Sequence, residues 1–98
     1  MMNQFTIAGD VVRTQNKVTQ SGKQVCNFSI KCKNRAGFDS TINVEMWHDN
    51  DPTVTAMQQG DQVTVYGSLR NQKNEFNGVT TWKLVCSGEF VEFGLPVS

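Results

Sequence analysis

The sequence lacks the cysteine and histidine patterns that mark disulfide scaffolds and zinc sites. Its 98 residues contain one histidine and three cysteines, Cys26, Cys32 and Cys86, and no two cysteines form a CxxC pair. An odd cysteine count without such a pair favours reduced thiols, as found in a cytoplasm. We therefore predict a cytoplasmic protein that holds no metal and no cofactor.

Long apolar runs and targeting segments are also missing. No apolar run approaches the roughly 20 residues of a membrane span. Residues 1–10 lack the basic start and the long apolar stretch of a secretory signal. With 38% hydrophobic residues and a net charge of zero, the chain is nevertheless too apolar for a disordered protein. We predict one domain over residues 1–98 with no membrane contact, whose small core favours oligomerisation.

Catalytic motifs are absent from the sequence as well. His48–Asp49 is the only histidine with a neighbouring acid, and no nucleophile or substrate pocket is marked beside it. No glycine-rich phosphate loop, His-x-x-x-His pair or thiol–histidine arrangement is present. We therefore predict that the protein is not an enzyme, and that His48 is a surface histidine after a strand.

Charge is balanced in sum but not along the chain. Residues 11–38 contain six basic residues and no acid, whereas residues 39–61 contain five acids and no lysine or arginine. A polyanion responds to the field of one face rather than to the total charge, so the basic segment is a candidate nucleic-acid surface. The alternative is that both segments are solvated faces that lie near each other in the fold.

Apolar and polar residues alternate with a period of two, which is typical of half-buried strands. A first strand is expected at Phe5–Gly9, extended by Val11 and Val12, and the glycine inside it suggests a bulge or a close backbone approach. The later strands are expected around inward-facing Cys26, Phe28, Ile30 and Cys32, around Ile42, Val44 and Met46, over Val63–Arg70, and over Val79–Cys86. The outward-facing positions are Asn27, Ser29, Lys31, Lys33, Asn43, Glu45, Trp47, Thr64, Tyr66, Ser68 and Arg70. Turns are expected at Gln20–Lys23, Asn34–Gly37 and Asn77–Gly78.

One segment breaks this alternation and predicts a short helix. Asp51 and Pro52 suit an N-cap and a first helical position, residues 53–59 provide two turns, and Gly60 ends them. Val54 and Met57, three residues apart, would face the sheet. The order of five strands, with a helix between the third and the fourth, predicts an all-β fold, the five-stranded OB-fold barrel.

Four stretches carry a resemblance to bacterial single-stranded-DNA-binding proteins over roughly residues 3–93. They are Asn3–Gly9 with Val11 and Ser21–Ile30, then Ile42–Trp47, and then Gln59–Arg70. The family includes the short primosomal replication protein N-like relatives, which the length and Ala36–Phe38 also resemble. The resemblance implies binding of single-stranded DNA in replication, recombination or repair. It also implies a homo-oligomer, a dimer or tetramer, in which the first strand, with Phe5 and Ile7, pairs across a two-fold axis.

The sequence departs from that family at two places. Replicative members end in a flexible tail with an acidic tip that recruits partners, whereas this sequence ends at Leu95–Ser98 without one. We therefore carry over no tail-dependent partner. An aromatic residue that many members hold just after strand four corresponds to Asn74, and Phe76 is a candidate substitute in the same hairpin.

Binding of single strands without regard to sequence needs cations along the phosphates and aromatic faces for the unpaired bases. Trp47 stands where the family places a stacking aromatic, and Glu45 on the same face would repel phosphate. Phe38 is a base platform or a plug for the barrel end, Tyr66 a stacking or an interface residue, and Trp82 is expected in the core. The candidate nucleic-acid-binding residues are Lys31, Lys33, Arg35, Phe38, Trp47, Tyr66, Arg70, Lys73, Phe76 and Lys83. The alternative for Trp47 is packing against the helix or a subunit, and for the basic residues and Phe76 it is an ordinary solvated surface.

Three functions are compatible with this pattern. The first is non-catalytic, largely sequence-independent binding of single-stranded DNA. The second is a primosome-type adaptor that mainly docks replication proteins, with DNA binding accessory; the acidic middle segment favours it slightly. The third is a barrel that binds only protein or oligosaccharide, since OB-folds serve several ligands.

Overall fold

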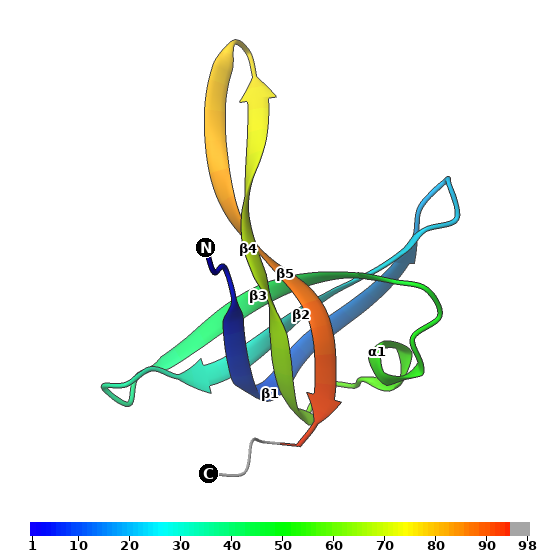
Figure 1. The fold of residues 1–98 in the computed structure, drawn as a ribbon, viewed down its shortest axis with the longest axis vertical. Helices are drawn as coiled ribbons and strands as arrows, with labels where there is room; N and C mark the ends of the chain where they lie inside the picture. The colour runs from blue at the N-terminus through cyan, green and yellow to red at the C-terminus, as the bar shows by residue number, and fades with distance from the viewer. Residues whose placement is uncertain (95–98) are drawn as a thin grey trace.

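The structure is a computed structural model that describes residues 1–94, and strands make up most of it (Figure 1). In chain order the elements are β1 (Phe5–Val18), β2 (Gln24–Lys33), β3 (Asp39–His48), α1 (Pro52–Ala56), β4 (Gln62–Phe76) and β5 (Val79–Phe93). The strands close into a barrel in the order β1-β2-β3-β5-β4, in which only β3 and β5 pair in parallel. The predicted OB-fold barrel, with its helix between the third and fourth strands, is confirmed. Leu95–Ser98, where the sequence departs from the tailed family members, lies outside the described residues.

The barrel core follows the predicted alternation in β2 and β3. The buried cluster comprises Val11, Cys26, Phe28, Ile30, Val44, Met46, Val54, Met57, Val63, Val65 and Val91. Two positions expected to face outward, Ser29 and Thr64, are buried as well. Each has a partner for its hydroxyl group: Ser29 Oγ donates to Asn43 Oδ1 at 2.6 Å, and Thr64 Oγ1 donates to the carbonyl oxygen of Gly94 at 2.9 Å. Burial of these polar groups is tolerated because both are hydrogen-bonded.

The helix α1 begins as predicted but is shorter than predicted. The Asp51 carboxylate accepts a hydrogen bond from the Thr53 N–H at 3.0 Å, which satisfies a free donor of the first turn. Met57 already has an extended backbone, with ψ near 132°, so the helix ends there and not at residue 59. The backbone N–H of Gln58 then donates to the Asp61 carboxylate at 2.8 Å instead of to a helical carbonyl. Val54 and Met57 are buried against the barrel, as expected.

Three strands run beyond the predicted boundaries. β1 continues to Val18, β4 to Phe76 and β5 to Phe93, so β1–β2 and β4–β5 form hairpins that project from the barrel (Figure 1). Apolar periodicity did not show the extensions of β1 and β4, because nearly all of the added side chains are exposed and no face of them meets the core. The extension of β5 runs back into the barrel, where Val91 is buried. The predicted turn at Asn77–Gly78 has positive φ at both residues, 51° and 77°, which suits a two-residue hairpin loop.

Gly9 lies where β1 bends between its two partner strands. A Cβ atom at this position would clash with the backbone oxygen of Lys31, so the expected close backbone approach is confirmed. The β1–β2 register then shifts between Val11 and Arg13, which is the bulge that such a glycine suggested. The shift places Arg13 beside Ser29 on the outward side of the sheet.

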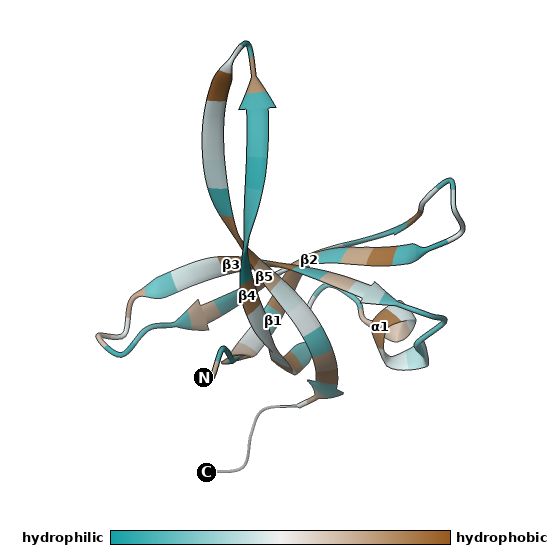
Figure 2. Cartoon of the chain, turned by 45° about the horizontal axis from the view of Figure 1, so that its top comes forward, coloured by the Kyte–Doolittle hydropathy of each residue, from teal (hydrophilic) through white to brown (hydrophobic). Residues whose placement is uncertain are grey.

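The placement of Trp82 in the core was wrong. Trp82 is 65% exposed and Leu84 is 62% exposed, because both lie on the part of β5 that projects beyond the barrel. Figure 2 shows that the β4 arm of this hairpin is hydrophilic over most of its length, whereas the β5 arm includes hydrophobic segments. Within residues 1–94 there is no helix of the length and apolarity required to traverse a lipid bilayer.

Candidate nucleic-acid interface

The outward face of β1, β2 and β3 is mostly polar and ends at a tryptophan. Directly opposed residues in antiparallel strands share a face, so the register defines its rows. From one end to the other these rows are Lys33–Asp39, Asp10–Lys31–Thr41, Arg13–Ser29–Asn43, Gln15–Asn27–Glu45 and Lys17–Val25–Trp47. At roughly 3.3 Å per residue, the eight steps from Asp39 to Trp47 span about 26 Å.

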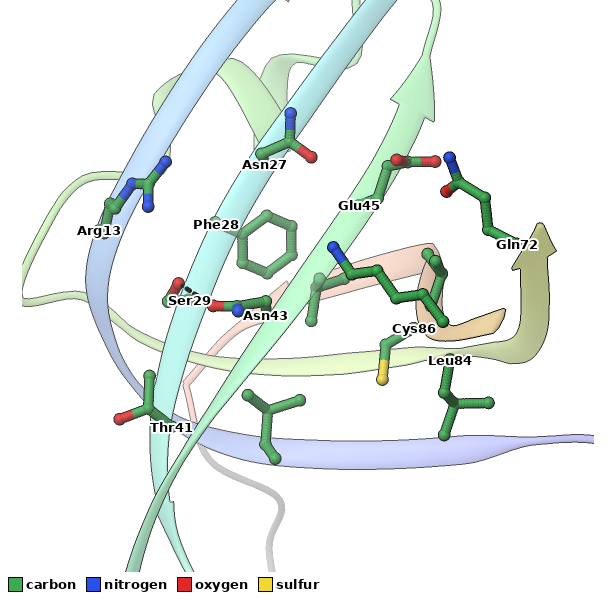
Figure 3. A pocket seen from close by; sticks show the side chains of 14 residues that line it. Arg13, Asn27, Phe28, Ser29, Thr41, Asn43, Glu45, Gln72, Leu84 and Cys86 are labelled. Atoms are coloured by element: carbon green, nitrogen blue, oxygen red, sulfur yellow. Dashed lines mark hydrogen bonds between the residues drawn. The ribbon is translucent and has the colours of Figure 1, made fainter. Parts of the chain in front are cut away.

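An open groove of about 410 Å³ lies between this face and the base of the β4–β5 hairpin (Figure 3). From the barrel it is lined by the polar side chains of Arg13, Asn27, Ser29, Thr41, Asn43 and Glu45 and by the apolar ones of Phe28, Ile42 and Val44. From the hairpin it is lined by the side chains of Gln72, Lys83, Leu84, Val85 and Cys86. Amide and hydroxyl groups supply hydrogen-bond donors and acceptors, and Arg13 and Lys83 supply charge. The groove can therefore accommodate a polar, anionic chain.

Trp47 is held beside this groove by Glu45. The indole is 48% exposed, and its Nε1–H donates to Glu45 Oε1 at 2.9 Å. Arg70 Nη2 donates to the same oxygen at 2.6 Å, so the Arg70 guanidinium neutralises the Glu45 carboxylate. Trp47 thus lies outside the core, as its parity predicted, and Glu45, which was expected to repel phosphate, is paired with Arg70 of the hairpin.

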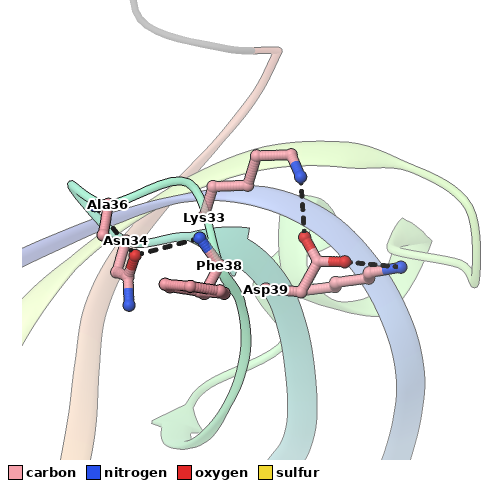
Figure 4. Close-up of polar contacts among 6 residues, drawn as sticks. Lys33, Asn34, Ala36, Phe38 and Asp39 are labelled. Atoms are coloured by element: carbon pink, nitrogen blue, oxygen red, sulfur yellow. Dashed lines mark hydrogen bonds and ion pairs between the residues drawn. The ribbon is translucent and has the colours of Figure 1, made fainter.

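Lys31 and Lys33 converge on one carboxylate at the other end of the face (Figure 4). Lys33 Nζ is 3.0 Å from Asp39 Oδ1, and Lys31 Nζ is 3.4 Å from Asp39 Oδ2. The hydrogen bond from Lys33, with the positive charges of Lys31 and Lys33, holds the pKa of Asp39 below its usual value. Both lysines lie on the face that the sequence predicted, but the Asp39 carboxylate partly neutralises their positive charges.

Phe38 is presented by a hydrogen-bonded loop beside these lysines. Asn34 Oδ1 accepts hydrogen bonds from the backbone N–H groups of Ala36 at 3.0 Å and Phe38 at 3.1 Å (Figure 4). The Phe38 side chain is 71% exposed, so it does not fill the barrel end. Arg35 is exposed in the same loop. The base platform is therefore the alternative for Phe38 that the geometry permits.

The hairpin presents its remaining candidates on two faces. Gln72 and Lys83 are directly opposed and line the groove, whereas Lys73 and Trp82, one residue along on each strand, point to the other face. Lys73 Nζ pairs with a Glu75 carboxylate oxygen at 2.9 Å. Phe76 is 78% exposed next to the turn.

Tyr66 lies apart from this groove. Its ring packs against Phe90 with centroids 5.9 Å apart and an interplanar angle of 38°, and neither residue lines the groove. Tyr66 is half-buried, and Phe90 is 54% exposed. The structure thus separates Tyr66 from the other candidates.

Sequence reasoning missed residues that line the groove, and it misplaced Trp82. Arg13, Asn27 and Asn43 line the groove, whereas Trp82 is exposed on the hairpin face turned away from it. The alternation of polar residues continues after Val12 at Arg13 and Gln15, and this signal would have predicted a longer first strand. No comparable signal in the sequence indicates that Trp82 is exposed, because it alternates in step with Leu84 and Cys86 as a core residue would.

The three thiols are free, and their burial differs. Cys26 is fully buried, whereas Cys32 and Cys86 are half-buried. Burial raises the pKa of both Cys26 and Cys86, so these thiols are protonated at neutral pH. Cys86 is the one that lines the groove.

Residues 1–94 contain no group of three or more His, Cys, Asp or Glu side chains positioned to hold a metal ion. His48 Nδ1 accepts a hydrogen bond from the Asp51 backbone N–H at 3.2 Å, next to the start of α1. This contact gives His48 a structural role.

Comparison with known proteins yields one family and one fold. The sequence model of the single-strand binding protein family matches residues 2–93. No curated protein sequence is significantly similar to the chain. Among solved structures, the fold is similar to that of a Plasmodium falciparum SSB in complex with ssDNA, with a TM-score of 0.74 and 18% sequence identity over 95% of each chain.

Proposed function

Because the chain belongs to the single-strand binding protein family, we propose that it binds single-stranded DNA along the outward face of β1, β2 and β3, against the β4–β5 hairpin. The observation that carries this proposal is the exposed Trp47 beside a groove of polar side chains. Bases would stack on aromatic faces, each worth about 1–3 kcal/mol, and cations would contact the phosphates. Such binding tolerates any sequence because every base has a stacking face.

The interface we propose retains the candidates from the sequence and adds Arg13. They are Lys31, Lys33, Arg35, Phe38, Trp47, Tyr66, Arg70, Lys73, Phe76 and Lys83. Within residues 1–94, Arg35 and Lys83 form no ion pair, and neither does Arg13, so these three are available to phosphate without displacing a carboxylate. Tyr66 and Lys73 are the weakest members, because Tyr66 packs on Phe90 outside the groove and Lys73 points to the hairpin face turned away from it.

Family membership favours DNA binding over the primosome-type adaptor. The family is a non-catalytic DNA-binding family, and we propose that this chain likewise acts by binding alone, in replication, recombination or repair. Three free thiols support our proposal of a cytoplasmic location. One barrel spans β1 to β5, which supports a single OB-fold domain over residues 1–98.

Proteins of this family are typically oligomeric, and a homo-oligomer is part of the proposal. Phe5 and Ile7, expected to lie at a two-fold contact through β1, pack against the barrel core, where they are half-buried. Tyr66 and Phe90 form an aromatic pair on β4 and β5 outside the groove, which supports self-association on that side of the barrel. Sedimentation of the parent and of Phe90→Ser tests this contact, and an unchanged mass would exclude it.

Titration of a fluorescent oligothymidine, followed by anisotropy at low and moderate salt, tests the function. We expect binding by the parent that weakens as salt increases, because phosphate contacts release counterions. Trp47→Ala should weaken it, whereas Phe93→Ala, which removes another aromatic of similar exposure (52% against 48%), should not. No binding by the parent at low salt would disprove the function, and equal losses in the two variants would disprove the site.

A further inference from the structure

Glu45 is out of place on a surface that binds a polyanion. Among the described residues that line the groove, it is the one carboxylate. A carboxylate in that position repels phosphate unless it is neutralised, and it lowers the local positive potential. A side chain with this disadvantage needs another explanation.

The contacts of Glu45 supply that explanation. Its Oε1 accepts one hydrogen bond from Trp47 Nε1 at 2.9 Å and another from Arg70 Nη2 at 2.6 Å. The Glu45 side chain is 25% exposed and that of Arg70 is 43% exposed, so the pair is partly shielded from water. Hydrogen bonds to an ionised carboxylate are roughly twice as strong as neutral ones. A single oxygen therefore joins the stacking aromatic to a cation of the hairpin.

We infer that Glu45 is a positioning residue of the interface, which fixes the indole of Trp47 and holds Arg70 until a phosphate displaces it. This inference rests on the proposed binding of single-stranded DNA. Fixing the edge of the indole through Nε1 leaves its two faces free for a base. Occupying Arg70 means that DNA must break an ion pair to gain that phosphate contact, so Glu45 lowers the affinity of the site.

The pair also braces the hairpin, and this second role must be separated from the first. β3 and β5 pair at only two positions, Val44 with Cys86 and Glu45 with Ser87. Arg70 comes from β4, which lies beyond β5, and reaches Glu45 across that short contact. A brace alone would alter the stability of the hairpin, but it would not alter how steeply DNA binding depends on salt.

The test measures oligothymidine affinity against salt for Glu45→Gln. Glutamine keeps a carbonyl acceptor for the indole but removes the charge that holds Arg70. We expect about two- to fivefold tighter binding at low salt, which is the range of a partly exposed ion pair. The slope of log affinity against log salt should steepen by about 0.7, the value for one added phosphate contact on a single strand. Glu92→Gln, a charge-matched change near the end of β5, should give neither effect.

Arg70→Gln completes a double-mutant cycle. If Arg70 carries the gain, Glu45→Gln should have no effect on DNA binding in an Arg70→Gln background. An equal gain in that background would overturn the inference, because Glu45 would then act only as a repulsive charge. Parent-like affinity and slope for Glu45→Gln would overturn it too.

Trp47 emission tests the other half of the inference. In a Trp82→Phe background, emission reports Trp47 alone. Glu45→Ala removes the acceptor for the indole, and we expect a shifted emission maximum and weaker quenching by DNA, whereas Glu45→Gln should quench as the parent does. Identical quenching in both variants would overturn the positioning role. A parent that binds no oligothymidine would overturn both this inference and the proposed function. If the parent binds but the Glu45 variants behave like it, only the inference about Glu45 is overturned.

Discussion

The strands β4 and β5 each pass through two different environments. In the barrel, Val63 and Val65 are fully buried and Val91 is 5% exposed, so alternate side chains form the core. In the projecting hairpin, every residue from Arg70 to Leu84 is exposed. The same pair of strands thus serves stability at one end and leaves its other end free for contact with a ligand.

The hairpin is held by few interactions compared with the barrel. It has a regular ladder from Arg70–Val85 to Phe76–Val79, and ion pairs at Arg70–Glu45 and Lys73–Glu75. Exposed ion pairs contribute about 0–1 kcal/mol each, and an isolated two-stranded hairpin is marginal in water. Substitutions in the hairpin should therefore change DNA binding with little effect on unfolding, whereas core substitutions should do the reverse.

The largest expected effect tests this division with two phenylalanines. Phe28→Ala removes a fully buried ring and should lower the free energy of unfolding by about 3–5 kcal/mol. Phe76→Ala removes a ring that is 78% exposed and should change that energy by about 0.5 kcal/mol or less. Urea unfolding at one protein concentration measures both, since oligomerisation makes stability depend on concentration. A comparable loss for Phe76→Ala would show that the hairpin packs on something that stabilises the fold.

The two tryptophans test whether DNA binding depends more on the barrel groove or on the outer face of the hairpin. Trp47→Ala should weaken oligothymidine binding by about 1–3 kcal/mol, since a stack is lost at the groove. Trp82 points to the hairpin face away from the groove, so Trp82→Ala should cost about 1 kcal/mol or less. Anisotropy titrations at one salt concentration compare them, and circular dichroism verifies folding. A larger loss for Trp82→Ala would place the main stacking platform on the hairpin.

The barrel could be read from the sequence because its burial follows a period of two. Phe28, Val44 and Val65 each alternate with more polar neighbours, as expected where one face of a strand meets a core. Trp82 and Leu84 continue the same parity, yet they lie past the point where β5 leaves the barrel. Strand parity assigns a face to a residue, but it does not show how far along the strand the core extends.

The site was predicted less completely than the fold, for a related reason. The outward position of Trp47 followed from parity, and the exposure of Phe38 agrees with one of its two alternatives. The role of Glu45 depends on Arg70, which lies 25 residues away in the sequence. Contacts between distant strands determine whether a charge is available or already paired, and no local pattern shows them.

Protection of Cys86 and Cys32 from alkylation shows whether DNA covers the groove more than another part of the barrel. Cys86 lines the groove and Cys32 does not, although both are half-buried. Saturating oligothymidine should therefore slow alkylation of Cys86 by iodoacetamide severalfold, and that of Cys32, which lies beside Lys31 and Lys33 at the end of the face, to a smaller extent. Burial raises the pKa of Cys86, so the rates are best compared at mildly alkaline pH, where more thiolate is present. Peptide mass spectrometry gives the rate at each cysteine, and an unchanged rate at Cys86 would place DNA elsewhere.

The smallest expected effect concerns Asp39, whose pairing with Lys31 and Lys33 resembles the Lys73–Glu75 pair on the hairpin. The pKa of Asp39 is lower in the folded protein than in the unfolded chain, because Lys33 donates a hydrogen bond to it and both lysines attract its charge. Its ionised form therefore favours folding above the unfolded pKa of about 3.9, and this contribution is lost as the pH falls through the lower folded value. Asp39→Asn should thus be slightly less stable than the parent at pH 7, and the difference should disappear in acid.

DNA binding by the same variant should change in the opposite direction, which separates the two ends of the interface. Asparagine releases two lysines on the rigid outward face of the barrel, whereas Glu75→Gln releases one lysine on the face of the hairpin turned away from the groove. We expect Asp39→Asn to bind oligothymidine about twofold more tightly at low salt, with a steeper salt dependence, and Glu75→Gln to match the parent. A gain for Glu75→Gln that equals or exceeds that for Asp39→Asn would show that the strand wraps the outer hairpin face, and the division between a binding groove and a spare face would then be wrong.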